Sequence, residues 1–197
     1  MAERYLQILT TPAVARAQAH YYGRSTPPVE SRPGRDSLGP EEQEFISSRD
    51  SLYLATVAET GWPYMQHRGG PAGFLRVMDE HTLAFADYQG NRQMLSTGNL
   101  AVNDKVSLFL MDYPNRTRLK ILGHARVQDA RNQVELVAEL TDARLKRVVE
   151  RIFFIDVVSF DWNCPKYITP RYTAAEVESA LAPLRRRIAE LETQIKS

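Results

Sequence analysis

Residues 119–127 have the sequence LKILGHARV, the clearest alternating segment of the chain. Every odd-numbered position is apolar or small, and most even-numbered positions are polar or charged. Because successive side chains of a β-strand point to opposite faces of the sheet, this pattern predicts a strand with one buried face. Gly123 and Ala125 are small enough for the crowded interior of a small β-barrel.

Six further segments have the pattern of short strands. They are residues 52–58, 64–68, 74–78, 82–87, 106–111 and 150–160. The short connection at residues 79–81 predicts a hairpin, and helical insertions are expected at residues 92–100 and 132–140. Several short strands joined by tight turns favour a closed barrel or a sandwich over a βαβ sheet. The sequence therefore predicts a mainly β fold with peripheral helices.

The residues before the first strand have a different composition. Thr11-Pro12 is expected to cap and begin a helix, and Gly23 is expected to end it. Residues 23–40 contain four prolines and three glycines, which is typical of an arm or an extended loop. Pro40-Glu41-Glu42 is expected to open a short helix, because acidic residues suit a helix N-terminus.

Large apolar residues of the C-terminal segment follow a 4-3-4-3-4 spacing. They are Val177, Leu181, Leu184, Ile188, Leu191 and Ile195. Two interpretations remain open: a short parallel coiled coil, in which Arg187 and Glu192 attract each other, or a helix docked on its own barrel. Pro183 lies inside the segment and is expected to kink the helix unless the helix begins near it.

Overall composition excludes several classes of protein. The chain has 197 residues with 25 basic and 24 acidic side chains, so a net charge of +1 does not indicate nucleic-acid binding. Cys164 is the single cysteine, which excludes an intrachain disulfide; it is either a small buried residue or a thiol activated by Lys166. The four histidines show no metal-ligand spacing. With neither a signal peptide nor a membrane-spanning run, we expect a soluble cytoplasmic protein.

Two segments combine glycines with residues that bind anions. In residues 64–71, YMQHRGGP, Arg68 ends a strand beside two glycines, where a guanidinium group could bind a phosphate. In residues 85–93, FADYQGNRQ, Asn91 is expected to cap a helix that begins at Arg92, which would give an anion site at a helix N-terminus. Each segment alone is explained as simply by a surface arginine or by an ordinary capped helix.

A third segment, residues 160–172, has the sequence FDWNCPKYITPRY. Its aromatic and basic residues could stack on a planar ring and pair with an anionic substituent. The alternative is a connector whose aromatic side chains pack on the barrel.

Together these three segments resemble the pyridoxamine 5'-phosphate oxidase-like FMN-binding split-barrel family. The resemblance covers about residues 45–172 and is strongest for a subgroup with QHRGGP-like, DxxGNRQ and DWNCPxxITPR segments. The residues at Asn163-Cys164-Pro165 and the C-terminal helix differ from the true pyridoxamine phosphate oxidases. The resemblance therefore implies a related subgroup rather than that enzyme.

The implied fold is a split β-barrel of the FMN-binding type with an N-terminal arm and a long C-terminal helix. On this basis we divide the chain into three regions. Residues 1–40 would form an N-terminal helix and a Pro/Arg-rich arm, residues 41–172 the FMN-binding domain, and residues 173–197 an amphipathic helix.

In that family each FMN lies in a cleft between the two barrels of a homodimer. The residues implied for the cofactor site are Gln66, His67, Arg68, Ala86, Asp87, Tyr88, Asn91, Arg92, Gln93, Met111, Asp112, Trp162, Lys166 and Arg171. The first two would line the flavin ring or the ribityl chain, and residues 86–88 would contact the ring. Arg68 and Arg92 would bind the phosphate, with Asn91 and Gln93 beside it. The last five residues would come from the partner subunit.

The resemblance implies an FMN-dependent oxidoreductase that acts on an unidentified small molecule, with neither nucleic acid nor a membrane as a partner. No residue is selected as a general acid or base. The alternatives are a non-catalytic carrier of flavin, haem or the deazaflavin F420, and a structural dimerisation protein with an empty cleft.

Overall fold

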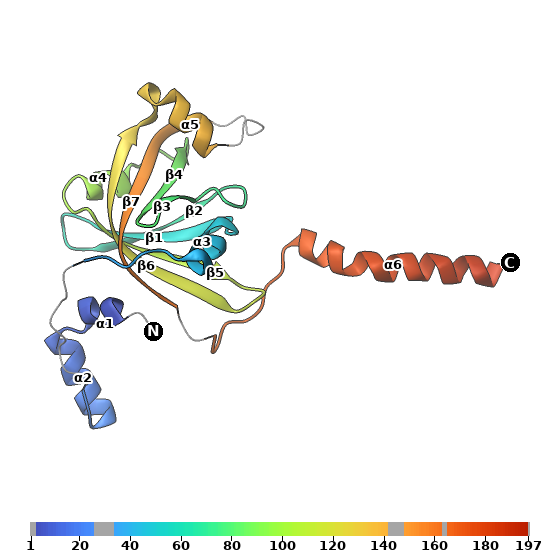
Figure 1. Ribbon diagram of the computed structural model, residues 1–197, viewed down its shortest axis with the longest axis horizontal. Coiled ribbons are helices and arrows are strands. Elements are labelled where there is room, and N and C mark those ends of the chain that lie inside the picture. The colour runs from blue at the N-terminus through green and yellow to red at the C-terminus, as the bar shows by residue number, and fades with distance from the viewer. Residues whose placement is uncertain (1–2, 26–33, 142–147, 163–164, 197) are drawn as a thin grey trace.

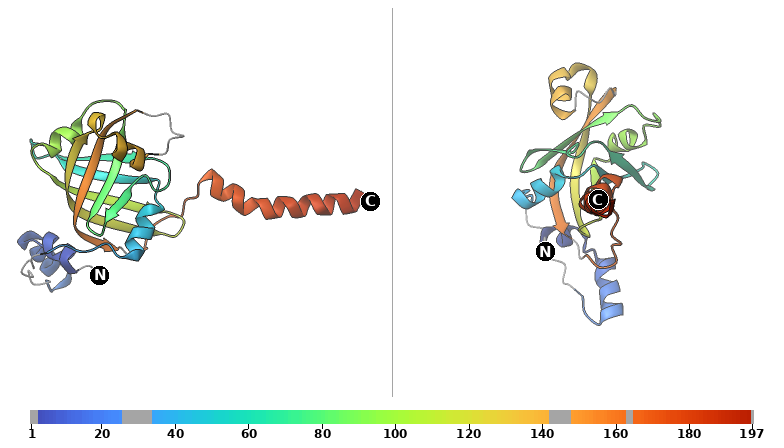
Figure 2. Two further views of the ribbon diagram at one scale, coloured as in Figure 1. Left: turned by 45° about the horizontal axis from the view of Figure 1, so that its top comes forward. Right: turned by 90° about the vertical axis from the view of Figure 1, so that its right-hand side faces the viewer.

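The computed structural model describes residues 3–25, 34–141, 148–162 and 165–196. Its centre is a seven-stranded antiparallel sheet with the strand order β2-β1-β5-β6-β7-β4-β3. The strands are β1 (Ser51–Val57), β2 (Pro63–Gly69), β3 (Arg76–Asp79), β4 (Thr82–Tyr88), β5 (Lys105–Asp112), β6 (Thr117–Asp129) and β7 (Val149–Trp162). The sheet curls into a barrel that stays open between its end strands β2 and β3 (Figures 1 and 2). The fold is the split β-barrel that the family resemblance implied, whereas the strand pattern alone favoured a closed barrel or a sandwich.

The two longest strands, β6 and β7, are paired in the middle of this sheet. Along β6, Leu119, Ile121 and Ala125 are buried, whereas His124 and Arg126 are exposed, so the predicted alternation is confirmed. Gly123 has no room for a side chain, because a Cβ atom there would lie 2.7 Å from Ile155 Cγ2. A small residue is therefore required at this position, where the register of β6 and β7 shifts.

The helices lie outside the sheet. They are α1 (Glu3–Leu9), α2 (Pro12–Tyr22), α3 (Pro40–Ser47), α4 (Leu95–Leu100), α5 (Val134–Leu140), which follows a 3-10 turn at Ala130–Asn132, and α6 (Ala174–Lys196). The predicted signals around α2 are confirmed: the Thr11 hydroxyl accepts from the Val14 N–H, and Gly23 ends the helix with a left-handed φ of 67°. In α3 the Glu42 carboxylate accepts from the Gly39 N–H at 3.0 Å.

The expected start of α4 at Arg92 is wrong. Arg92 and Met94 have positive φ angles of 57° and 59°, and a right-handed helix does not accommodate such residues. The helix begins only at Leu95, and Asn91 does not cap it. Residues 89–94 instead form a loop between β4 and α4.

The residues that precede α3 close one side of the barrel. The Asp36 N–H donates to the Val158 carbonyl at 3.0 Å, and the Leu38 N–H donates to the Glu80 carbonyl at 2.8 Å. Leu38 itself is buried in the core. The centre of the predicted Pro/Arg-rich arm, residues 26–33, lies outside the described residues, as does Cys164.

Helix α6 projects away from the barrel along its whole length (Figures 1 and 2). Its described side chains, residues 174–195, are all exposed, so the interpretation of a helix docked on its own barrel is wrong. The helix begins at Ala174 and continues through Pro183, so it does not begin near the proline, which was one of the two expectations for this segment. None of the helices in the described part of the chain has the length and apolar character needed to cross a bilayer.

Candidate functional site

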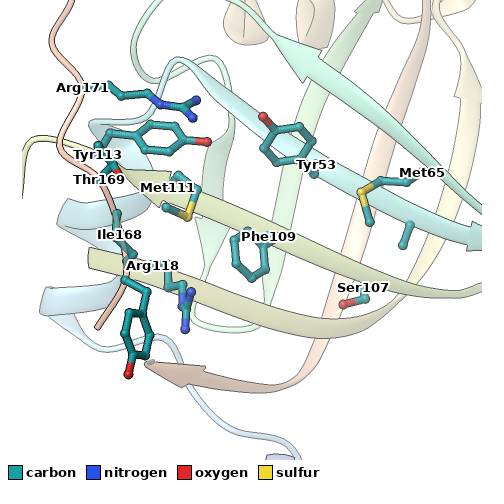
Figure 3. Close-up of a pocket in the computed structure, with 12 residues that line it drawn as sticks. Tyr53, Met65, Ser107, Phe109, Met111, Tyr113, Arg118, Ile168, Thr169 and Arg171 are labelled. Atoms are coloured by element: carbon teal, nitrogen blue, oxygen red, sulfur yellow. The ribbon is translucent and has the colours of Figure 1, made fainter. Parts of the chain in front are cut away.

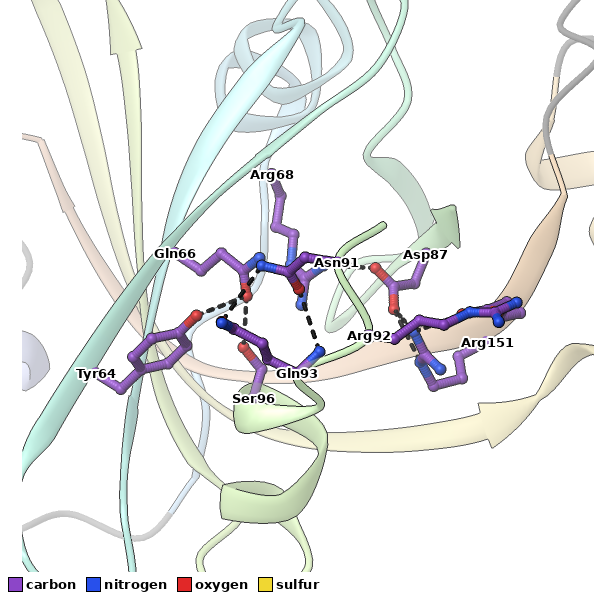
Figure 4. Close-up of polar contacts among 10 residues, drawn as sticks. Tyr64, Gln66, Arg68, Asp87, Asn91, Arg92, Gln93, Ser96 and Arg151 are labelled. Atoms are coloured by element: carbon purple, nitrogen blue, oxygen red, sulfur yellow. Dashed lines mark hydrogen bonds and ion pairs between the residues drawn. The ribbon is translucent and has the colours of Figure 1, made fainter. Parts of the chain in front are cut away.

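Strand β2 separates two environments. Its residues Tyr64, Gln66 and Arg68 are half-buried, whereas Met65 and His67 are exposed on the opposite face. Figure 4 shows the first three side chains on the same side of β2 as the 89–94 loop. The period of two along the strand therefore gives each face of β2 its own cavity.

The cavity on the first face has a volume of about 160 Å³, and we call it the arginine pocket. Its lining residues are Tyr64, Gln66, Arg68, Asp87, Tyr88, Gly90, Asn91, Arg92, Gln93, Met94, Leu95, Ser96, Thr97 and Arg151. Seven of the residues implied by the family resemblance thus meet around one cavity, although β2, β4 and the 89–94 loop are distant in the sequence.

Asp87 is the electrostatic centre of the arginine pocket (Figure 4). One carboxylate oxygen accepts from Arg68 Nη1 at 2.5 Å, and the other accepts from Arg151 Nε at 2.9 Å. The Asp87 side chain is only 5% exposed, so both ion pairs are largely shielded from bulk water. Both guanidinium groups are consequently held in fixed orientations.

Arg92 has a different environment. Its Nη2 lies 2.9 Å from Glu150 Oε1, but its side chain is 61% exposed. Glu150 also lies 3.2 Å from Arg151 Nη2, which joins the two ion pairs. Three guanidinium groups therefore meet two carboxylates, and the pocket keeps a net positive charge.

Neutral polar groups complete the wall of the pocket. Gln66 Oε1 accepts hydrogen bonds from the Tyr64 hydroxyl at 3.1 Å and from the Ser96 hydroxyl at 3.3 Å. In the loop, Asn91 Oδ1 accepts from the Gln93 N–H at 3.2 Å. These contacts fix the amide groups at the rim.

Arg68 also has one donor that the described residues leave unsatisfied. Arg68 Nε is buried and makes no hydrogen bond with the described residues, while the guanidinium carbon lies 5.2 Å from the centre of the Phe153 ring. An unpaired buried donor is costly unless it gains a partner. The donor set fits an anion with several oxygen atoms, such as a phosphate. The volume suits a group of that size and lies below the range of about 300–1,000 Å³ typical of whole small-molecule sites.

The second face of β2 borders a larger cavity of about 530 Å³, which we call the tyrosine cleft (Figure 3). It is lined by Tyr53, Ala55, Met65, Ser107, Phe109, Met111, Tyr113, Arg118, Tyr167, Ile168, Thr169 and Arg171. The Arg171 guanidinium lies 4.9 Å from the centre of the Tyr113 ring. A hydrogen bond with Tyr53, followed by burial, raises the pKa of the Tyr113 hydroxyl. Arg118 Nε is buried without a hydrogen-bond partner among the described residues.

The other implied residues lie outside the arginine pocket. His67 and Ala86 line a neighbouring cavity with Phe74 and Phe85. Met111 and Arg171 line the tyrosine cleft. Lys166 is exposed at the start of the connector to α6.

Asp112 and Trp162 make contacts within their own chain. Asp112 pairs with Arg49 at 2.8 Å. Trp162 Nε1 donates to Glu42 Oε1 at 2.7 Å, and its ring meets the edge of Phe45 at a centroid distance of 4.8 Å. Trp162 thus anchors α3 to the end of β7, and Asp112 holds Arg49, between α3 and β1, at the end of β5.

Sequence reasoning missed Arg151 and most of the tyrosine cleft. Arg151 is the direct partner of Asp87 in the register of β4 and β7, and only the strand pairing brings it to the pocket. The sequence does contain an indication of the cleft, because Phe109 and Met111 alternate with buried leucines along β5 and therefore share its other face.

Comparisons with known proteins agree with this architecture. The family model described as pyridoxamine 5'-phosphate oxidase matches residues 38–159, more than half of the chain. The structure of HupZ from Group A Streptococcus is similar with a TM-score of 0.51 and 16% identity, over 68% of this chain and 99% of that one. A candidate pyridoxamine 5'-phosphate oxidase from Lactobacillus delbrueckii has a TM-score of 0.50 and 20% identity, over 64% and 93% of the two chains. At these identities the likeness shows a shared fold. None of the curated proteins matches the chain.

Proposed function

The chain belongs to the pyridoxamine 5'-phosphate oxidase family, and from this membership we propose that it binds FMN with the phosphate in the arginine pocket. We further propose that it works as a homodimeric, FMN-dependent oxidoreductase on a small molecule. The observation that carries the proposal is the convergence of Arg68, Arg92 and Arg151 on a cavity of phosphate size.

The chemistry of the donors supports this assignment. A planar guanidinium group binds two phosphate oxygens at once, and such charge-assisted hydrogen bonds are stronger than neutral ones. Asp87 holds Arg68 and Arg151 in position before any ligand arrives, which lowers the entropic cost of binding. Arg92, which is exposed, would turn from Glu150 towards the phosphate.

The size of the pocket supports the proposed dimer. A cavity of about 160 Å³ cannot enclose the flavin ring as well, so the ring needs further walls. Met111 and Arg171, which the family resemblance assigns to the partner, lie in the tyrosine cleft and apart from the arginine pocket of their own chain. We propose that the tyrosine cleft of a second copy completes the site.

Bound FMN would supply hydride and electron transfer at its ring. The chain's own residues would bind and orient the cofactor: the arginines through the phosphate, and Gln66 and Tyr88 along the pocket wall. Among the described residues, no group of three or more His, Cys, Asp and Glu side chains is placed to hold a metal ion.

The test is an FMN titration of the purified protein, followed by gel filtration and a visible absorption spectrum. We expect flavin to co-elute at one per subunit. Arg92→Ala should weaken FMN binding by about tenfold or more, because it removes an exposed phosphate ligand without disturbing the core. The matched control is Arg186→Ala on the exposed helix α6, which should bind like the wild type. Protein that retains no FMN would overturn the proposal and direct attention to F420 and haem.

A second measurement separates an enzyme from a carrier. Anaerobic addition of NADH, NADPH or another donor should bleach the flavin absorbance if the protein catalyses electron transfer. A bound flavin that every tested donor leaves oxidised would favour the carrier function.

A further inference from the structure

Helix α6 exposes a continuous apolar stripe, which we call the α6 seam. Its residues are Val177, Leu181, Leu184, Ile188, Leu191 and Ile195. Their exposed fractions range from 37% at Leu181 to 85% at Ile195. A monomer would leave six large apolar side chains in water on one helix, whereas such stripes are normally buried.

The barrel of the same chain does not cover the seam. The 23-residue helix points away from the barrel, and its described side chains are all exposed (Figures 1 and 2). Its start is well defined, since the Thr173 hydroxyl accepts from the Glu176 N–H while the Glu176 carboxylate accepts from the Thr173 N–H at 2.7 Å. The capping contacts fix where the helix begins, but most of the stability of a helix in a protein comes from packing its apolar face.

We infer that the α6 seam pairs with α6 of a second copy of this chain in a parallel, two-stranded coiled coil. With Leu181 at a heptad position a, Ile188 and Ile195 also occupy a, and Leu184 and Leu191 occupy d. Isoleucine at a combined with leucine at d favours two parallel strands over higher oligomers. The identity of the partner thus follows from the side chains of the seam.

The charges beside the seam agree with the parallel arrangement. Arg187 occupies position g and Glu192 occupies the following e, and in a parallel pair these positions of opposite helices meet. Within one chain Arg187 instead pairs with Glu190 at 2.9 Å, on the exposed face of the helix. In the pair, each Arg187 faces Glu192 of the other copy.

Pro183 is compatible with this pairing. It falls at heptad position c, on the outer face of the helix, and α6 continues through it. Proline removes one backbone N–H but places no bulk in the seam. The two-fold axis of a parallel coiled coil also suits the proposed dimer of barrels, yet the pairing requires neither FMN nor contact between barrels.

Cysteine cross-linking tests the pairing and its direction. In a Cys164→Ser background, Ile195→Cys places a thiol at position a near the helix end, and Thr193→Cys places one at the outer position f as the matched control. After mild oxidation with diamide, we expect most of the Ile195→Cys protein to run as a covalent dimer, largely independent of dilution. The Thr193→Cys protein should remain mostly monomeric. An antiparallel pair holds the two ends apart, so absent cross-linking at residue 195, or equal cross-linking at both positions, would overturn the inference.

A seam variant separates coiled-coil pairing from chance collision. Leu184→Asp combined with Leu191→Asp should abolish the cross-link at Ile195→Cys while leaving the barrel folded, as judged by its thermal unfolding transition. A cross-link that persists would contradict the inference. FMN binding of the same variant reports separately on the proposed cofactor site, so the failure of one proposal is distinguishable from the failure of the other.

Discussion

Arg68 of β2 and Asp87 of β4 form an ion pair of 2.5 Å across the open side of the barrel. In the strand order, β2 stands at one end of the sheet and β4 stands next to the other end, so no backbone hydrogen bonds join them. The pair therefore closes the split with side chains. Because Asp87 also binds Arg151 of β7, the same contact that ties the barrel together shapes the arginine pocket.

Asp87→Asn should destabilise the protein by about 3 kcal/mol, because it leaves the partly buried Arg68 without its counter-ion and Arg151 with Glu150 alone. Urea unfolding at pH 7 measures this loss. Saturating inorganic phosphate or FMN should restore part of it, since an anion in the pocket replaces the lost charge.

The control for that substitution is Asp104→Asn. Asp104 pairs with His124 at 2.9 Å, but both side chains are about half exposed. Exposed ion pairs contribute about 0–1 kcal/mol, so this variant should unfold like the wild type. Equal losses of unfolding free energy for the two substitutions would show that the ion pairs of Asp87 contribute no more to stability than an exposed pair.

Gly123→Ala should destabilise the barrel by about 1–3 kcal/mol through overpacking. The added methyl group would lie 2.7 Å from Ile155 Cγ2 and 2.8 Å from the Asp156 carbonyl oxygen of the neighbouring strand β7. The comparison is Gly98→Ala in α4, where a Cβ atom meets nothing within 4 Å and alanine favours the helix. Thermal unfolding should show a lower midpoint for the first variant and an unchanged or higher midpoint for the second. A stable Gly123→Ala protein would contradict the observed packing.

Asp112 should make the stability of the protein depend on pH in the acid range. Burial alone would raise the pKa of Asp112, but hydrogen bonds from Asn115 and the Arg49 cation outweigh burial and lower the pKa. A lowered pKa means that the carboxylate contributes stability above its unfolded pKa of about 3.9, and this contribution is lost as the pH falls through the folded value. Asp112→Asn should therefore lower the free energy of unfolding by about 1–3 kcal/mol at pH 7. The difference from the wild type should shrink by pH 3, and a difference that is the same at both pH values would refute the assignment.

Local rules predicted much of the fold. The alternation along residues 119–127 gave the central strand, and the signals at Thr11 and Gly23 gave both ends of α2. The sequence also predicted that Gly123 lies in a crowded barrel interior, and the structure confirms that there is no room for a side chain. Each of these features depends on near neighbours in the sequence or on a simple period.

Features that depend on long-range geometry were missed or mistaken. The sequence GNRQ suits a capped helix, but the left-handed backbone at Arg92 and Met94 turns it into a loop over the pocket. Arg151 looks like a charged residue at the edge of an apolar strand, and only the register with Asp87 shows its place in the site. The exposed position of α6 was also undecided, because its apolar stripe suits its own barrel and a second helix equally well.

The most direct test of the central claim compares FMN with riboflavin, which has the same ring but lacks the phosphate. If the arginine pocket binds the phosphate, the wild-type protein should bind FMN at least about a hundredfold more tightly than riboflavin, as several charge-assisted hydrogen bonds predict. Arg92→Ala should reduce this preference and leave the affinity for riboflavin nearly unchanged. Equal affinities for the two flavins in the wild-type protein would contradict the assignment of the phosphate to Arg68, Arg92 and Arg151.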